Sequence, residues 1–116
     1  MATVTYEEVK DVPNQPNTFV IDVRNKDELA RTGVIPGAIS VPMPDLEAAF
    51  QMSEIYFKTA FNRDKPSTET VLIFSCQAGG RAKRAYDLAL ANGYKNAKYY
   101  PGSWTEWAEK EGLNKA

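Results

Sequence analysis

The segment that decides the fold of this chain reads Val71-Leu72-Ile73-Phe74-Ser75-Cys76-Gln77-Ala78-Gly79-Gly80-Arg81-Ala82. A short apolar run bounded by turn residues predicts a buried strand over residues 71–74. The two glycines predict a tight turn, and the pattern of residues 82–92 predicts a helix that ends at an Asn-Gly pair. The only cysteine among 116 residues, Cys76, therefore falls between the end of a buried strand and the N-terminus of a helix.

Shorter signals on either side of this segment predict the rest of the fold. Two capping-box pairs, Thr5 with Glu8 and Asn25 with Glu28, each predict the start of a helix. Strands that alternate with helices predict an α/β fold, a single domain over residues 1–116 with a parallel sheet covered by helices on both faces. Strands are expected at 19–23, 39–41 and 98–100, and helices at 5–12, 25–33, 45–50, 54–61 and from 103 onward.

The composition excludes several classes of function. The chain has 14 Lys and Arg residues against 15 Asp and Glu, a formal net charge of −1, and 43% hydrophobic residues. This is enough apolar material for one core, without the basic excess that nucleic acid or an anionic membrane would require. Histidine is absent, which excludes a histidine general base, and one cysteine leaves no ordinary zinc site and no internal disulfide. We therefore expect no metal and no cofactor.

The N-terminal residues are not expected to form a secretory signal. The first residues have neither the basic segment nor the apolar segment of a secretory signal. No apolar run approaches the roughly 20 residues of a membrane-spanning helix. These observations lead us to expect a cytoplasmic monomer without a membrane partner.

The residues around Cys76 predict a thiolate site. If the strand ends at Ser75 and the helix starts near Arg81, the peptide N–H groups between them converge on one point and bind an anion there. The permanent charge of Arg81 adds to this field, so the loop favours a thiolate over a thiol without a histidine. The same donors would hold the anionic outer sulfur of a persulfide, a species that is easily oxidised or reduced. The loop donors are expected from Gln77, Ala78, Gly79, Gly80, Arg81 and Ala82.

A plainer interpretation of Cys76 remains open at this point. A lone cysteine after an apolar strand is often only a small buried hydrophobic side chain. The Gly-Gly-Arg sequence that follows, at a junction between strand and helix, favours the site.

Four motifs resemble those of the rhodanese-type sulfurtransferases. Residues 76–81 match C-x-x-G-x-R, and Asp22-Val23-Arg24 with Glu28 resembles D-V-R-x-x-x-E. Residues 33–40 resemble G-H-I-P-G-A-x-N, and residues 100–107 are similar to Y-D-G-S-W-x-x-W. The resemblance covers about residues 5–111, and the size suggests the small single-domain thiosulfate sulfurtransferases.

The resemblance implies a fold, a reaction and its partners. The fold is a five-stranded parallel sheet with helices on both faces. Cys76 takes a sulfane sulfur from thiosulfate or a persulfide and passes it to cyanide, glutathione or a protein thiol, which is covalent ping-pong catalysis. Arg81 would hold the sulfonate oxygens of the donor. Val34, Ser40 and Pro101 depart from the family pattern, which leaves the substrate preference more open than the reaction.

Other residues near the predicted site have two interpretations each. Asp22 has two interpretations. It either supports the cysteine loop, residues 76–82, by binding the N–H groups of that loop or Arg81, or it only caps a turn. Arg24 and Glu28 lie four residues apart and are expected to form an ion pair at a helix start. Trp104 either lines the rim of the pocket or belongs to the core. Lys83 is either a solvated helix charge or a rim residue that steers anions.

Three other functions stay open as alternatives. A rhodanese-like domain can be a non-catalytic interaction module, or it can relay sulfur to a partner protein by the same chemistry. A phosphatase on the same fold is the third. Its loop is C-x-x-x-x-x-R, with the arginine six positions after the cysteine, whereas Arg81 lies at position five. The shorter loop favours a sulfane sulfur over a phosphate ester.

Overall fold

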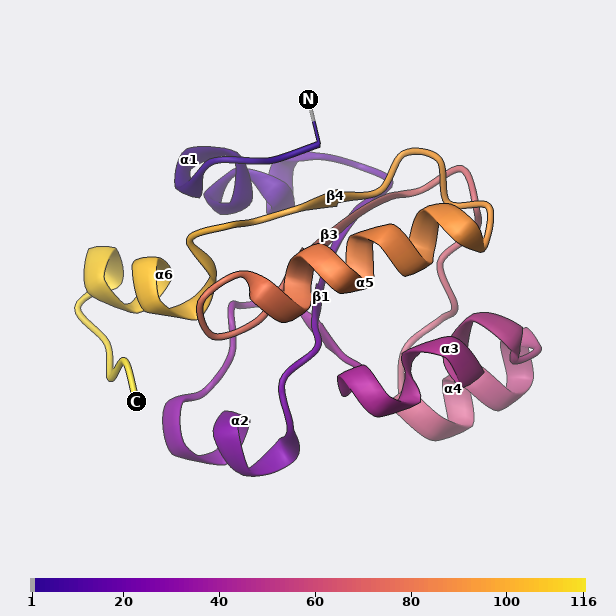
Figure 1. Cartoon of the computed structure of the whole chain (residues 1–116), viewed down its shortest axis with the longest axis horizontal. Coiled ribbons are helices and arrows are strands. Elements are labelled where there is room, and N and C mark those ends of the chain that lie inside the picture. The colour runs from indigo at the N-terminus through magenta and orange to yellow at the C-terminus, as the bar shows by residue number, and fades with distance from the viewer. Residues whose placement is uncertain (1) are drawn as a thin grey trace.

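The structure is a computed structural model that describes residues 2–116. Its centre is a parallel sheet with the strand order β2-β1-β3-β4. Figure 1 labels three of these strands, β1, β3 and β4. The longest strands, β1 and β3, pair over their full length from Thr18 with Val71 to Asp22 with Ser75. The strands are β1 Thr18–Asp22, β2 Ile39–Ser40, β3 Val71–Ser75 and β4 Lys98–Tyr99.

The expectation of five strands is wrong for the described residues, because the sheet has four. A single parallel bridge joins Thr3 to Tyr99 beside β4, at the position a fifth strand would take. Two hydrogen bonds make this bridge, from Val4 N–H to Tyr99 O and from Tyr99 N–H to Ala2 O, at 3.0 and 2.9 Å. The chain cannot extend it, because the capping box at Thr5 starts a helix immediately afterwards.

Six α-helices within residues 2–116 surround the sheet. The capping boxes predicted at Thr5 and Asn25 are confirmed at the starts of the first two. The helix after the cysteine loop begins at Gly80, two residues before its expected start. The helices are α1 Tyr6–Lys10, α2 Lys26–Thr32, α3 Leu46–Gln51, α4 Glu54–Phe61, α5 Gly80–Ala91 and α6 Ser103–Glu111, with 3₁₀ turns η1 Val12–Asn14 and η2 Met43–Asp45.

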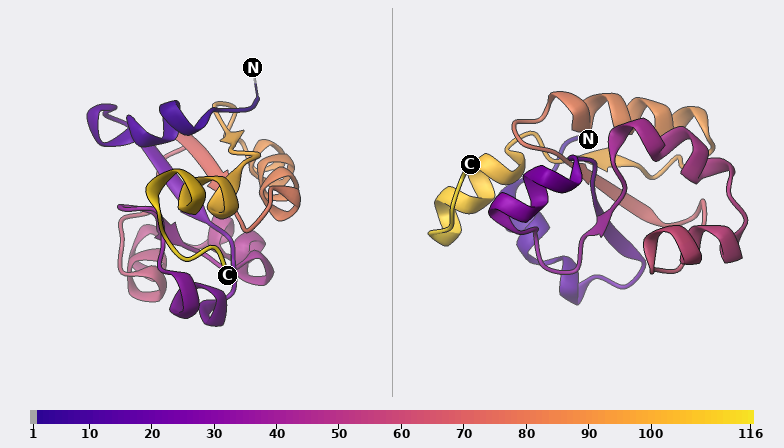
Figure 2. Two further views of the ribbon diagram at one scale, coloured as in Figure 1. Left: turned by 90° about the vertical axis from the view of Figure 1, so that its left-hand side faces the viewer. Right: turned by 90° about the horizontal axis from the view of Figure 1, so that it is seen from below.

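Helices cover both faces of the sheet, as expected. Side chains alternate along a strand, so Val20 and Ile73 pack under α1 and α6, whereas Ile21 and Phe74 pack under α3, α4 and α5. Figure 2 shows α1 and α5 on opposite sides of the central strands. No helix among the described residues is long and apolar enough to cross a membrane.

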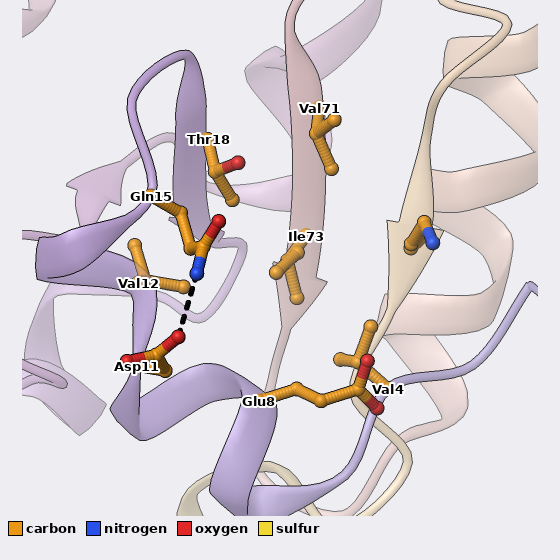
Figure 3. Close-up of a pocket in the computed structure, with 9 residues that line it drawn as sticks. Val4, Glu8, Asp11, Val12, Gln15, Thr18, Val71 and Ile73 are labelled. Carbon is orange, nitrogen blue, oxygen red and sulfur yellow. Dashed lines mark hydrogen bonds between the residues drawn. The ribbon is translucent and has the colours of Figure 1, made fainter.

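One cavity of about 420 Å³ lies between the sheet and the segment that contains α1 and η1. Figure 3 shows Val71 and Ile73 on its floor and the hydrogen-bonded pair Asp11 and Gln15 on its wall. Thr18, at the start of β1, lines it too, whereas Cys76 follows the end of β3. The strands are parallel, so this cavity belongs to the opposite edge of the sheet from the cysteine.

Candidate active site

Cys76 lies directly after β3, at the carboxyl edge of the sheet, and is 1% exposed. Its Sγ accepts hydrogen bonds from the N–H groups of Gly79 at 3.0 Å and of Ala82 at 3.4 Å. Ala82 belongs to the first turn of α5, so the sulfur also lies at the positive end of that helix. Of the donors predicted from the loop, these two are seen on the sulfur.

The two loop glycines have different roles. Gly79 has a φ of +105°, and a Cβ there would lie 2.6 Å from the carbonyl oxygen of Pro101. Position 79 therefore requires glycine for two reasons, its backbone angle and the close approach of the segment that contains Pro101. Gly80 has no positive φ, and a Cβ there would meet nothing within 4 Å. Glycine is therefore required at position 79 and not at position 80.

The N-terminus of α6 holds the cysteine loop from the other side. The backbone N–H of Trp104 donates to Cys76 O at 3.0 Å, and that of Thr105 donates to Gln77 O at 3.1 Å. The Thr105 hydroxyl donates to the same Gln77 oxygen at 2.9 Å. Ser103 Oγ accepts the N–H of Cys76 at 3.1 Å. Buried peptide groups require partners, and here α6 supplies them.

The sequence does not predict Ser103 and Thr105 as residues of the site. Their place in the motif of residues 100–107 was the available signal, but hydroxyl residues before a helix usually act only as caps. The sequence does not reveal that the same groups satisfy a loop almost thirty residues away.

Arg24 is fully buried, and all five of its N–H groups have acceptors. Nε–H and one N–H of Nη2 donate to the Asp22 carboxylate, with the closest contact at 2.9 Å. The others reach the carbonyl oxygen of Gly33, the hydroxyl of Thr32 and the side-chain oxygen of Gln77. Its guanidinium also lies 5.0 Å from the ring centre of Trp104. Arg24 has no donor left for a substrate.

These contacts correct two expectations. Asp22 accepts from the backbone and side chain of Arg24, rather than from the loop N–H groups or Arg81. Asp22 supports the cysteine loop indirectly, because it holds Arg24 and Arg24 contacts Gln77 in the loop. Arg24 and Glu28 do not pair as predicted, since Glu28 instead binds Arg81.

Arg81 and Glu28 form a bidentate ion pair with contacts of 2.7 and 2.9 Å. Hydrogen bonds from Arg81 lower the pKa of Glu28 to about 2. The pKa of Arg81 is raised, first by its hydrogen bond to Glu28 and to a smaller extent by the charges of Glu28, Cys76 and Asp22. Arg81 keeps a quarter of its side chain exposed, and two of its five N–H groups are used by Glu28. Three remain for a ligand.

Trp104 and Lys83 each have two interpretations, and their contacts agree with the one that does not place them at the rim. Trp104 is 1% exposed and packs from α6 into the core, with its Nε1–H donating to Asn114 O at 2.8 Å. It is buried because Arg24 covers it on the side of the site. Lys83 is exposed and its Nζ pairs with Asp87 one turn along α5, at 2.9 Å. This ion pair holds the charge of Lys83 along the helix.

The sequence matches the rhodanese-like domain over residues 5–110. The chain belongs to the rhodanese-like family. A rhodanese domain-containing protein of Drosophila melanogaster is 47% identical over 94% of this chain and 98% of its own length. The thiosulfate:glutathione sulfurtransferase of Homo sapiens is 38% identical over 94% of this chain and 95% of its own length.

Solved structures of rhodanese-like proteins agree with this assignment. The human single-domain sulfurtransferase TSTD1 superposes with a TM-score of 0.88 at 37% identity, covering 95% of this chain and 97% of its own. The single-domain sulfurtransferase RDL2 of Saccharomyces cerevisiae superposes with a TM-score of 0.83 at 35% identity, covering 95% and 90%. The rhodanese-like fold thus accounts for nearly the whole chain.

We expect Gly79→Ala to disturb the cysteine loop, whereas Gly80→Ala leaves it intact. The new Cβ at position 79 strains the backbone and meets Pro101, which lowers the free energy of unfolding by about 1–3 kcal/mol. The new Cβ at position 80 meets nothing and removes a helical glycine, so stability stays the same or rises by up to about 1 kcal/mol. Urea unfolding measures both variants, and equal destabilisation by the two would contradict the assignment.

The buried ion pair generates a second prediction. Arg24→Met leaves the Asp22 carboxylate buried without its charged partner, with only the backbone N–H of residue 24 still donating to it, which costs about 3–5 kcal/mol of unfolding free energy. The double variant Asp22→Asn with Arg24→Met removes the lone charge and regains part of that loss. Urea unfolding of the single and double variants tests this. A double variant less stable than Arg24→Met alone would show that the carboxylate stabilises the fold by some other contact.

Proposed function

We propose that this protein is a thiosulfate sulfurtransferase that carries sulfane sulfur on Cys76. The observation that carries the proposal is the placement of Sγ, which two peptide N–H groups and the positive end of α5 hold, with Arg81 in the first turn of the same helix. Such a site stabilises sulfur as an anion, as a sulfurtransferase requires in its thiolate and persulfide states. Relatives at 32–38% identity are named thiosulfate sulfurtransferases.

The reaction proceeds in two half-reactions. The Cys76 thiolate attacks the outer sulfur of thiosulfate, the S–S bond of thiosulfate breaks, and sulfite leaves with the bonding electron pair. The product is a persulfide on Cys76, whose outer sulfur carries the negative charge. An acceptor thiolate or cyanide then attacks this outer sulfur, and Cys76 regains its electron pair as a thiolate. No redox cofactor is needed, because the sulfur moves without a net change in electrons.

Arg81 orients the donor in this scheme. Its guanidinium has three N–H groups beyond the pair with Glu28, and these can reach sulfonate oxygens. Glu28 fixes one edge of the guanidinium, which lowers the entropy lost when the donor binds. The backbone N–H groups of the loop hold the transferred sulfur itself.

The acceptor and the setting follow from the same chemistry. Human and yeast relatives are named thiosulfate:glutathione sulfurtransferases, which supports glutathione as the acceptor. We propose a monomer that works in a reducing compartment such as the cytoplasm, where thiol acceptors are abundant. Two fungal relatives are named as mitochondrial, so a mitochondrial setting would suit the same reaction.

The alternatives differ from the proposal in one measurable property each. A phosphatase would hydrolyse phosphate esters and would not gain sulfur. A non-catalytic module would bind a partner without a covalent change on Cys76. A relay protein would accept sulfur but release it only to a protein thiol.

We expect purified protein treated with thiosulfate to gain one sulfur atom, about 32 Da, in intact-mass spectrometry without reductant. Cyanide or glutathione should remove this mass. Cys76→Ser is the control and should gain nothing. A wild-type protein that takes no sulfur from thiosulfate or from a low-molecular-weight persulfide would refute the proposal.

The proposed role of Arg81 predicts different effects on donors that have a sulfonate group and on donors that lack one. Arg81→Ala should raise the KM for thiosulfate roughly ten-fold or more, because a charge-assisted hydrogen bond contributes about 1.5–3 kcal/mol. The KM for a low-molecular-weight alkyl persulfide, which donates its outer sulfur but has no sulfonate group, should change much less. Arg84→Ala removes the same charge from an exposed position on α5 and serves as the matched control. Equal effects of the two variants would mean that only the net charge of the helix matters.

A further inference from the structure

Ser103, the first residue of α6, lies against the reacting sulfur and is fully buried. Its Oγ is 3.8 Å from Cys76 Sγ. The same oxygen accepts the N–H of Cys76 at 3.1 Å and donates to the carbonyl oxygen of Tyr100 at 2.8 Å. The hydroxyl thus contacts both the backbone and the sulfur of the nucleophile.

The backbone of Ser103 adds a second, independent observation. Its φ is +52°, in the left-handed region. The other non-glycine residues in that region, within residues 2–116, are Asn17 and Asn62, and asparagine tolerates it better than serine. Glycine would adopt this angle without strain. A serine at this angle costs conformational energy that glycine would not, which indicates that the contacts of its hydroxyl offset that cost.

The hydroxyl has a single hydrogen, so its two acceptors compete for it. Tyr100 O holds it at 2.8 Å in this structure. A charged sulfur is a stronger acceptor than a neutral thiol, and rotation about the Cβ–Oγ bond redirects the hydrogen without moving a heavy atom. We propose that Ser103 is a third hydrogen-bond donor to Sγ, beside Gly79 N–H and Ala82 N–H, whenever Sγ carries negative charge.

This inference rests on the proposed function for its role in catalysis. Sγ is charged as the free thiolate, before it attacks the donor. It becomes charged again when an acceptor thiolate attacks the outer sulfur of the persulfide. The acceptor–sulfur bond then forms, the S–S bond breaks, and the electron pair returns to Sγ. Ser103 therefore stabilises Cys76 both as the resting nucleophile and as the leaving group, in the way an oxyanion-hole donor does.

Two substitutions separate this role from a structural one. Ser103→Ala removes the hydroxyl and keeps a β-carbon at the left-handed angle. Ser103→Gly removes the hydroxyl and relieves the backbone. The matched control is Ser75→Ala, which deletes a fully buried hydroxyl next to Cys76 that has no hydrogen-bond partner among the described residues.

The first readout is the pH profile of Cys76 alkylation by iodoacetamide. We expect both Ser103 variants to move the midpoint of this profile upward by about one pH unit, which corresponds to a ten-fold change in the thiol–thiolate equilibrium constant. Ser75→Ala should keep the wild-type midpoint. Thermal unfolding should give Ser103→Gly a higher midpoint than Ser103→Ala, because only the glycine relieves the strain. The two Ser103 variants should therefore show the same shift of the alkylation midpoint although their stabilities differ.

The second readout is the rate at which glutathione discharges the Cys76 persulfide formed with thiosulfate. Both Ser103 variants should discharge roughly ten-fold more slowly than wild type, in line with the lost donor. A wild-type alkylation midpoint in both variants, or an equal shift in Ser75→Ala, overturns the inference. Alkylation requires no sulfur transfer. It therefore tests the hydrogen bond from Ser103 to Sγ even if thiosulfate transfers no sulfur to Cys76 and the proposed function fails.

Discussion

The buried ion pair between Asp22 and Arg24 is the contact on which the carboxyl edge of the sheet depends. A buried charge is tolerated only when its hydrogen bonds are satisfied, and every N–H group of Arg24 has an acceptor. Those acceptors come from the end of β1, from the end of α2 and from the cysteine loop. One guanidinium thereby ties three segments together, and its flat face covers Trp104 of α6.

The two arginines of this network have different roles. Arg24 is fully buried and has no donor left, so it sets the shape of the loop. Arg81 is partly exposed and retains free N–H groups beyond its pair with Glu28, so it can meet an anion. Each arginine has its own carboxylate, which keeps the local charge nearly balanced. The field that favours an anionic sulfur therefore comes mostly from peptide dipoles rather than from net positive charge.

The parts of the fold that depend on local pattern could be predicted, and those that depend on distant partners could not. The capping boxes, the strand before Cys76 and the turn at Gly79 follow from spacing within a few residues. The exchange of partners among Asp22, Arg24, Glu28 and Arg81 does not, because four charges allow several pairings and only the packed structure selects one. The reduction of a fifth strand to a bridge at Thr3 is equally invisible, since it depends on where α1 docks.

The absence of histidine has a consequence for how such a site is built. A cysteine–histidine pair carries its activation in a side chain, which can be placed on many backbones. Here the donors are peptide N–H groups of the loop, so the activation lies in the backbone shape itself. That shape must then be held from outside, by Arg24 on one side and by the N-terminus of α6 on the other. The close approach of Gly79 to Pro101 follows from the same requirement, because the loop and the segment before α6 form one packed unit.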